Sequence, residues 1–96
     1  MKKKYTGQEM LKESINVDVA MDRLYDLAND ASVKGEIGVY MRHPAFYLAH
    51  LHKQSDKTPE SIWNAYKDFT ERLKEDGFKL HPPCKNHHLR ITWYYA

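Results

Sequence analysis

The last twenty residues constrain the fold most, because apolar and polar side chains alternate on both sides of a proline pair. The first alternating stretch covers 78–81, Pro82 and Pro83 follow, and alternation resumes over 88–95. A period of two is typical of strands whose faces differ. Two such strands joined by a short polar turn should pair antiparallel, and the hairpin needs helices to pack against. The residues expected on the apolar face of the second strand are Leu89, Ile91, Trp93 and Tyr95.

Helical patterns fill most of the remaining chain. We expect helices over 7–14, 17–32, 44–53 and 59–76, and a strand over 36–42. The helix over 59–76 has the clearest signals: Thr58 suits the N-cap, Pro59 the first turn, and Gly77 a left-handed end. Thr6 and Glu9 fit a capping box for the first helix. The chain is therefore predicted to be a helix-rich α+β domain with a C-terminal β-hairpin.

The same periodicities predict which side chains face the core. The strand over 36–42 should pack in the core through alternate residues. Each helix should pack through a stripe of apolar residues at three- and four-residue spacing. The residues expected inward are Val17, Ala20, Leu24, Leu27 and Ala31 in the second helix, Ile37, Val39 and Met41 in the strand, Leu48 and Leu51 in the third helix, and Ile62, Tyr66, Phe69 and Leu73 in the fourth.

The length of 96 residues fits one domain, with 1–16 as a helical extension and 17–96 as the core. A hydrophobic fraction of 42% argues against wholesale disorder. Cys84 is the only cysteine, which favours a reducing compartment. The basic start is not followed by an apolar run, and no stretch is long enough to cross a bilayer. We expect a cytoplasmic protein with no membrane partner.

Little in the sequence supports catalysis or a cofactor. There is no glycine pattern that would cradle a phosphate, and Cys84 beside histidines lacks a fixed partner for a thiol nucleophile. A second interpretation of that cluster is a metal site, because four zinc-ligating side chains gather near one turn. Their spacing matches no zinc motif that we can name, so we predict no enzyme, no cofactor and no metal. The cluster consists of His81, Cys84, His87 and His88.

Four aspartates recur at i, i+4 spacing along the helix over 17–32. Each pair of like charges at this spacing costs about 0.2–0.5 kcal/mol. We interpret the stripe as a solvated acidic face; a basic partner, a bound cation or the protein's own basic tail could also offset the repulsion. The four residues are Asp18, Asp22, Asp26 and Asp30.

The C-terminal twenty residues contain no acid. They contain Lys79, Lys85 and Arg90, which weakly indicates an anionic partner. Tyr40 and Tyr94 are expected on the polar side of their strands, where they could form part of an exposed aromatic patch. Such patches often mark protein interfaces.

The expected order of helix, strand, helix, helix and hairpin resembles the winged-helix domains of MarR-like regulators. The local sequence is also similar to that family at Thr58-Pro59-Glu60-Ser61-Ile62, in the run from Leu73 to Phe78, and at Leu89-Arg90-Ile91-Thr92. The resemblance implies that the helix over 59–76 enters the major groove and that the hairpin is a wing. It implies base reading by Ser61, Asn64, Lys67 and Asp68, and phosphate contacts by Lys85, Asn86, His87 and Arg90.

The sequence thus predicts a non-catalytic binding protein, with two candidate partners. Acids on the exposed face of the helix over 59–76, such as Glu71 and Glu75, would repel phosphate and place a protein partner ahead of DNA. A small protein-interaction or inhibitory module is the first prediction and a DNA-binding regulator the alternative; a homodimer is compatible with both. The predicted binding residues are Ser61, Asn64, Lys67, Lys85, Asn86, His87, Arg90 and Tyr94.

Overall fold

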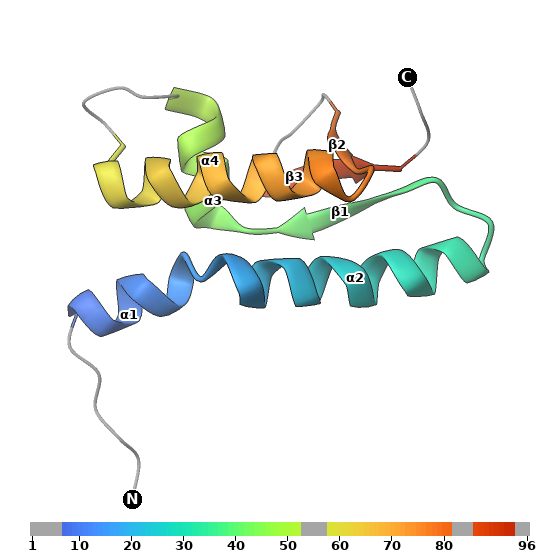
Figure 1. The fold of residues 1–96 in the computed structure, drawn as a ribbon, viewed down its shortest axis with the longest axis horizontal. Helices are drawn as coiled ribbons and strands as arrows, with labels where there is room; N and C mark the ends of the chain where they lie inside the picture. Colours follow the sequence, from blue (N-terminus) through green and yellow to red (C-terminus); the bar gives the residue numbers. More distant parts are fainter. Residues whose placement is uncertain (1–6, 53–57, 82–85, 94–96) are drawn as a thin grey trace, which may run out of the picture.

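A computed structural model describes residues 7–52, 58–81 and 86–93 of the chain (Figure 1). The elements follow in the order α1 (Gly7–Ser14), α2 (Val17–Val33), β1 (Gly38–Arg42), α3 (Pro44–His52), α4 (Glu60–Glu75), β2 (Lys79–Leu80) and β3 (His88–Thr92). The three strands form one antiparallel sheet in the order β1-β3-β2. The predicted α+β class, the order of elements and the C-terminal hairpin are therefore confirmed.

β3 is the central strand, and its register fixes both neighbours. It pairs with β1 from Gly38 opposite Thr92 to Arg42 opposite His88. It pairs with β2 through two residues of that strand, with Leu80 opposite Ile91. One face of the sheet packs against the helices, so alternate residues of β1 and β3 enter the core and those between them face away from it.

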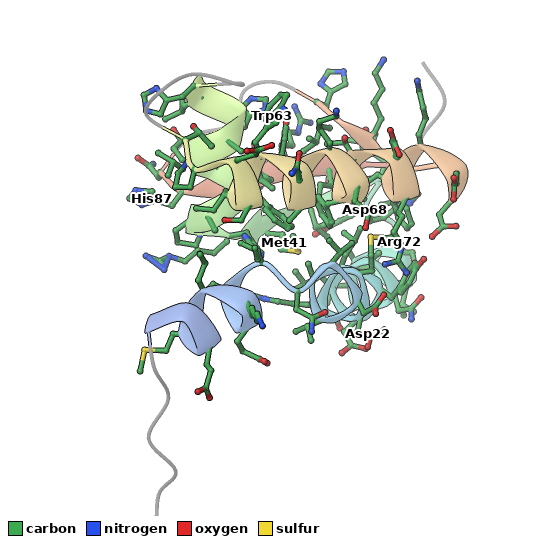
Figure 2. All side chains as sticks on the ribbon, turned by 60° about the vertical axis from the view of Figure 1, so that its left-hand side comes forward. Asp22, Met41, Trp63, Asp68, Arg72 and His87 are labelled. Carbon is green, nitrogen blue, oxygen red and sulfur yellow. The ribbon has the colours of Figure 1, made fainter. Side chains whose placement is uncertain are left out.

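The core joins the inner sheet face to the long helices. Figure 2 shows Met41 of β1 in the interior of the molecule. The apolar residues buried together in this cluster are Ala20, Met21 and Leu24 of α2, Met41 of β1, Phe46 of α3, Phe69 and Leu73 of α4, and Leu89 and Ile91 of β3. Ring contacts contribute at its centre, where Phe46 and Phe69 lie 4.9 Å apart between ring centroids.

The predicted end of α4 is confirmed. Gly77 has φ +83°, in the left-handed region that favours glycine. The following N–H, of Phe78, donates to the Leu73 carbonyl at 2.8 Å and so closes the last turn. This closure lets the chain leave the helix directly into β2.

The predicted N-cap of α4 is wrong. Pro59 takes the N-cap position, with φ −53° and ψ 142°, and no side chain caps the helix there. The Thr58 hydroxyl is buried and has no hydrogen-bond partner among the described atoms. The extended ψ of Pro59 moves the first turn one residue along the chain, and Trp63 N–H donates to the Pro59 carbonyl at 3.0 Å.

Most residues predicted to face inward do so, with three exceptions. Leu27 remains 36% exposed because α2 packs through Met21 and Ala28 on the other side of its stripe. Leu51 is 54% exposed, since two residues along a helix from the buried Ala49 place it on the opposite face. Ile37 is also 54% exposed because it precedes β1 rather than belonging to it.

Several predictions fall outside the described residues. They concern the Thr6 cap, the Pro82-Pro83 break, Cys84, Lys85, Tyr94 and Tyr95. Among the helices that the structure describes, none combines the length and apolar character needed to cross a membrane.

Gly38 lies where β1 and β3 approach closely, and it generates a stability prediction. A Cβ on Gly38 would stand 2.9 Å from Thr92 Cγ2 and 3.0 Å from the Ile91 carbonyl oxygen. We expect Gly38→Ala to lower the free energy of unfolding by about 1–3 kcal/mol, as overpacking typically does. Urea denaturation measures this.

Thr92→Ser provides the matched control, because it removes the methyl group that the new Cβ would meet. In the Gly38→Ala background this second change should recover part of the loss, giving a positive coupling in a double-mutant cycle. Unchanged stability of Gly38→Ala would contradict the close approach of the two strands.

Candidate functional site

The face of the sheet that points away from the core collects basic side chains. Met41, Leu89 and Ile91 are fully buried, so Tyr40, Arg42, His88 and Arg90, which alternate with them, point to the other face of the sheet. Thr92 shares that face but is buried there. On β1 and β3 the outward residues oppose each other in two pairs. Tyr40 lies opposite Arg90, and Arg42 lies opposite His88. We call this surface the outer sheet face: Tyr40, Arg42, Lys79, His88 and Arg90.

The outer sheet face carries three full positive charges and no acid. Arg42 and Lys79 are exposed, and Arg90 is half-buried. The Arg90 guanidinium lies 6.0 Å from the centre of the Tyr40 ring, at the outer limit of a cation–π contact. Tyr40 itself is 52% exposed, so this aromatic ring remains accessible beside a cation.

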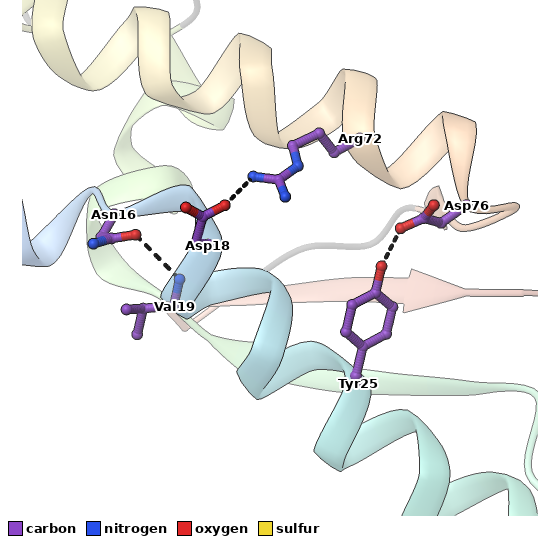
Figure 3. A network of polar contacts seen from close by, with 6 residues as sticks. All are labelled: Asn16, Asp18, Val19, Tyr25, Arg72 and Asp76. Carbon is purple, nitrogen blue, oxygen red and sulfur yellow. Dashed lines mark hydrogen bonds and ion pairs between the residues drawn. The ribbon is translucent and has the colours of Figure 1, made fainter.

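One acid, Glu36, lines a hollow with Tyr40 and Arg90. The aspartate stripe of α2 is partly compensated within the protein. Asp18 of α2 accepts a hydrogen bond from Arg72 of α4 at 2.6 Å, a contact that raises the Arg72 pKa. Asp30 pairs with Lys34 at 3.1 Å. Figure 3 shows the Asp18–Arg72 contact beside a second α2–α4 link. Of the alternatives for offsetting the stripe, a partner within the protein is found for Asp18, but it lies on α4 and not in the basic C-terminal tail.

The second link joins Tyr25 of α2 to Asp76 after α4. The Tyr25 hydroxyl donates to the Asp76 carboxylate (Figure 3). That hydrogen bond raises the Tyr25 pKa, because the carboxylate stabilises the protonated phenol. Both links tie α2 to α4 on the side of the molecule that carries the acids.

The predicted binding residues divide between separate surfaces. Ser61, Asn64 and Lys67 are exposed on α4, whose apolar stripe packs on the inner sheet face. Arg90 instead belongs to the outer sheet face, on the side of the sheet away from α4. The structure therefore groups Arg90 with Tyr40 and not with the predicted base-reading residues. Lys85 and Tyr94 lie outside the described residues.

Asn86 and His87 form the turn that enters β3. Both have positive φ, 56° and 63°, a conformation in which asparagine and histidine are enriched. The His87 ring contacts Tyr47 of α3 edge to face, with 5.4 Å between centroids, and the His87 carbonyl accepts from His43 N–H at 3.0 Å. Figure 2 places His87 at the α3 end of the molecule, away from Asp22 and Arg72.

The histidines of the predicted cluster are placed by the hairpin. His81 N–H donates to the Arg90 carbonyl at 2.9 Å, and His88 Nδ1 lies 2.7 Å from the Asn86 carbonyl oxygen. Within the described residues no three metal-ligating side chains gather, and Cys84 lies outside them.

Sequence reasoning missed Arg42, and it placed Lys79 only in a generally basic tail. Both residues stand out once β1 is seen to pair with β3, because that pairing brings Arg42 opposite His88. The alternation over 36–42 did indicate that Arg42 points away from the core. What the sequence lacked was the neighbour of that strand.

His43 caps α3 with its side chain. Phe46 N–H donates to His43 Nδ1 at 3.2 Å, and the two rings stack with 3.9 Å between centroids. His43 is only 9% exposed. Burial, together with the nearby charge of Arg23, lowers the His43 pKa from 6.5 to about 4. The imidazole is therefore neutral at pH 7, and because Nδ1 accepts a hydrogen bond, its proton is on Nε2.

The lowered His43 pKa predicts a pH-dependent stability. Between pH 6.5 and about 4, unfolded His43 takes up a proton that the folded protein does not. The free energy of unfolding should therefore fall with pH in this window, by about 1–2 kcal/mol after allowance for solvent screening. Urea denaturation at pH 7.0 and 4.5 measures the difference.

His43→Asn is the matched control, since asparagine can cap a helix but does not titrate. Its stability should be lower at pH 7 because the ring stacking is lost, yet it should depend less on pH. If the variant and the original protein lose the same free energy between pH 7.0 and 4.5, the account of His43 is wrong.

The chain was also compared with known proteins. No protein-family model, no curated protein and no solved structure matches it.

Proposed function

We propose that the protein binds nucleic acid, without catalysis, through the outer sheet face. One observation carries the proposal: strand pairing brings Arg42, Lys79 and Arg90 together on this face, beside the exposed Tyr40 ring. The net charge of the whole chain is only +2, so the distribution of charge matters more than its sum. Positive side chains collected on one face are the electrostatic footprint expected of a phosphate-binding surface.

The chemistry of the face suits a nucleic-acid backbone. Arginine and lysine neutralise phosphates and release their counterions, which supplies much of the affinity without regard to sequence. Tyr40 adds an exposed ring on which a base could stack, next to the Arg90 guanidinium. Proteins that bind single-stranded nucleic acid commonly combine basic side chains with exposed aromatic rings.

The order of elements supports the proposal through the winged-helix resemblance, but we infer a different contact surface. In that family the helix equivalent to α4 reads bases. Here the exposed side of α4 mixes Lys67 with Glu60, Glu71 and Glu75, which repel phosphate. We therefore propose that the sheet makes the principal contacts and that Ser61 and Asn64 of α4 contribute little.

A protein partner is the second candidate, and the free edge of β1 favours it. Among the strands that the structure describes, β1 has a neighbour on one side only, so it could accept another strand on the other side. A hollow of about 400 Å³ follows this edge, lined by Gly35, Glu36, Ile37, Gly38, Val39, Tyr40 and Arg90. Ile37 is 54% exposed and Tyr40 52%, so both side chains are available for apolar contacts with a strand of the partner protein.

Neutralising part of the outer sheet face should weaken nucleic-acid binding. We expect the double variant Lys79→Gln, Arg90→Gln to bind a fluorescein-labelled single-stranded 20-mer less tightly than the original chain does. The slope of log K against log salt should become shallower by about 1.4, which is about 0.7 for each of the two lost single-strand phosphate contacts. Fluorescence anisotropy between 50 and 300 mM salt measures both quantities, and a duplex 20-mer tests which form is preferred.

The matched control removes two exposed cations from α4 with Lys67→Gln, Lys74→Gln. Circular dichroism first establishes that both double variants are folded. The control should leave affinity and slope nearly unchanged. A larger loss in the α4 variant than in the sheet variant would overturn the sheet as the principal contact, and no binding by the original chain would overturn the proposed function.

A pull-down from host extract distinguishes the two candidate partners. Binding through several phosphates should disappear at high salt and after nuclease treatment. A partner held at the β1 edge by backbone hydrogen bonds and apolar contacts should survive both. Retention after nuclease at high salt would therefore favour the protein partner over nucleic acid.

A further inference from the structure

A second basic feature lies where four elements meet at the N-terminus of α3. A hollow of about 260 Å³ is lined by Ser14, Arg23, Arg42, His43, Pro44 and Ala45. These residues come from the end of α1, the middle of α2, the end of β1 and the start of α3. The hollow is below the usual size of a pocket for drug-sized ligands but has room for a small anion.

Two arginines face this hollow from different elements. Arg23 and Arg42 are both exposed, and in the part of the chain that the structure describes neither forms an ion pair. The charge of Arg23 reaches the buried imidazole of His43, where it disfavours a further positive charge. The hollow is therefore lined by two arginines. Their guanidinium groups are planar donors whose geometry matches phosphate oxygens.

His43 adds a buried neutral donor. Its side chain is 9% exposed, and it lines the hollow. Nδ1 is occupied by the Phe46 N–H, so the ring proton is on Nε2. That Nε2–H has no hydrogen-bond partner among the described residues. The His43 Nε2–H is thus available as a donor beside the two arginines, on a residue that is largely buried.

The backbone at the start of α3 contributes one more donor. Pro44 has no N–H, and the N–H groups of Phe46 and Tyr47 both donate to His43. The Ala45 N–H is left without a partner in the described part of the chain, at the positive end of the helix dipole. The Ser14 hydroxyl donates to the Met10 carbonyl at 2.9 Å and so adds no donor.

We propose that this hollow binds a phosphate group. Arg23 and Arg42 donate to its oxygens from two sides, and His43 Nε2–H and Ala45 N–H complete the donor set. Arg42 also belongs to the outer sheet face, so the hollow and that face share a residue. A backbone phosphate of the bound nucleic acid is therefore the occupant we assign, and this assignment rests on the proposed function.

Titration with inorganic phosphate tests the hollow without nucleic acid. In ¹H–¹⁵N spectra at constant ionic strength, the Ala45 amide and the Arg23 Nε–H signals should shift saturably, while chloride should not move them. Arg23→Gln should weaken phosphate binding at least about tenfold, the loss expected for one charge-assisted hydrogen bond. Lys74→Gln, which removes one positive charge from the last turn of α4, should leave it unchanged. No saturable shift, or equal affinity in Arg23→Gln, would overturn the site.

The labelled single-stranded 20-mer then distinguishes the two sources of phosphate. A backbone occupant requires that the oligonucleotide also shift the Ala45 amide, and that Arg23→Gln lower its salt slope by about 0.7, the value for one single-strand phosphate. An oligonucleotide that binds without these effects would overturn the backbone assignment while leaving the proposed function intact. Phosphate binding in a chain that binds no oligonucleotide would overturn the proposed function and identify a free phosphate as the occupant.

Discussion

The rest of the structure depends on β3, a five-residue strand near the C-terminus that pairs with β1 on one side and with β2 on the other. Its pairing with β1 brings the C-terminal hairpin against the middle of the chain. This pairing has two consequences that cannot be separated. It buries Met41 against Leu89 and Ile91, and it places Tyr40 and Arg42 beside Arg90 on the opposite face. With a side-chain period of two, a slip of one residue would exchange the two faces, so the register that builds the core also builds the basic surface.

The charges are separated by the same architecture. The two polar links between α2 and α4, Asp18 with Arg72 and Tyr25 with Asp76, lie on the helical side of the molecule. Such exposed contacts stabilise a fold only modestly. Their clearer effect is to pair an α4 cation with an α2 acid within the protein, while three basic residues lie on the outer sheet face. A chain of small net charge can in this way present a positive surface.

Local patterns in the sequence were enough to predict the helices and strands, but not which of them lie next to one another. The apolar stripe of α4 and the glycine that ends it predict that helix within one residue at each end, and alternation predicts β1 and β3. The prediction that Thr58 is the N-cap was wrong because Pro59 has an extended ψ angle, so the helix begins one residue later. The residue types alone do not determine that angle. Arg42 escaped notice as a site residue because the pairing of β1 with β3 is a contact across the chain. The His43 cap and the hollow beside it depend on four elements meeting, which no local pattern records.

The most direct test of the account is a map of backbone amide shifts while unlabelled single-stranded 20-mer is added to ¹⁵N-labelled protein. The central claim is that the outer sheet face makes the contact. It predicts that the largest shifts occur at Tyr40, Arg42, His88 and Arg90, and at Arg23 and Ala45 beside the hollow, with little change along α4. Shifts concentrated instead at Ser61, Asn64 and Lys67 would show that α4 contacts the nucleic acid and would contradict the claim.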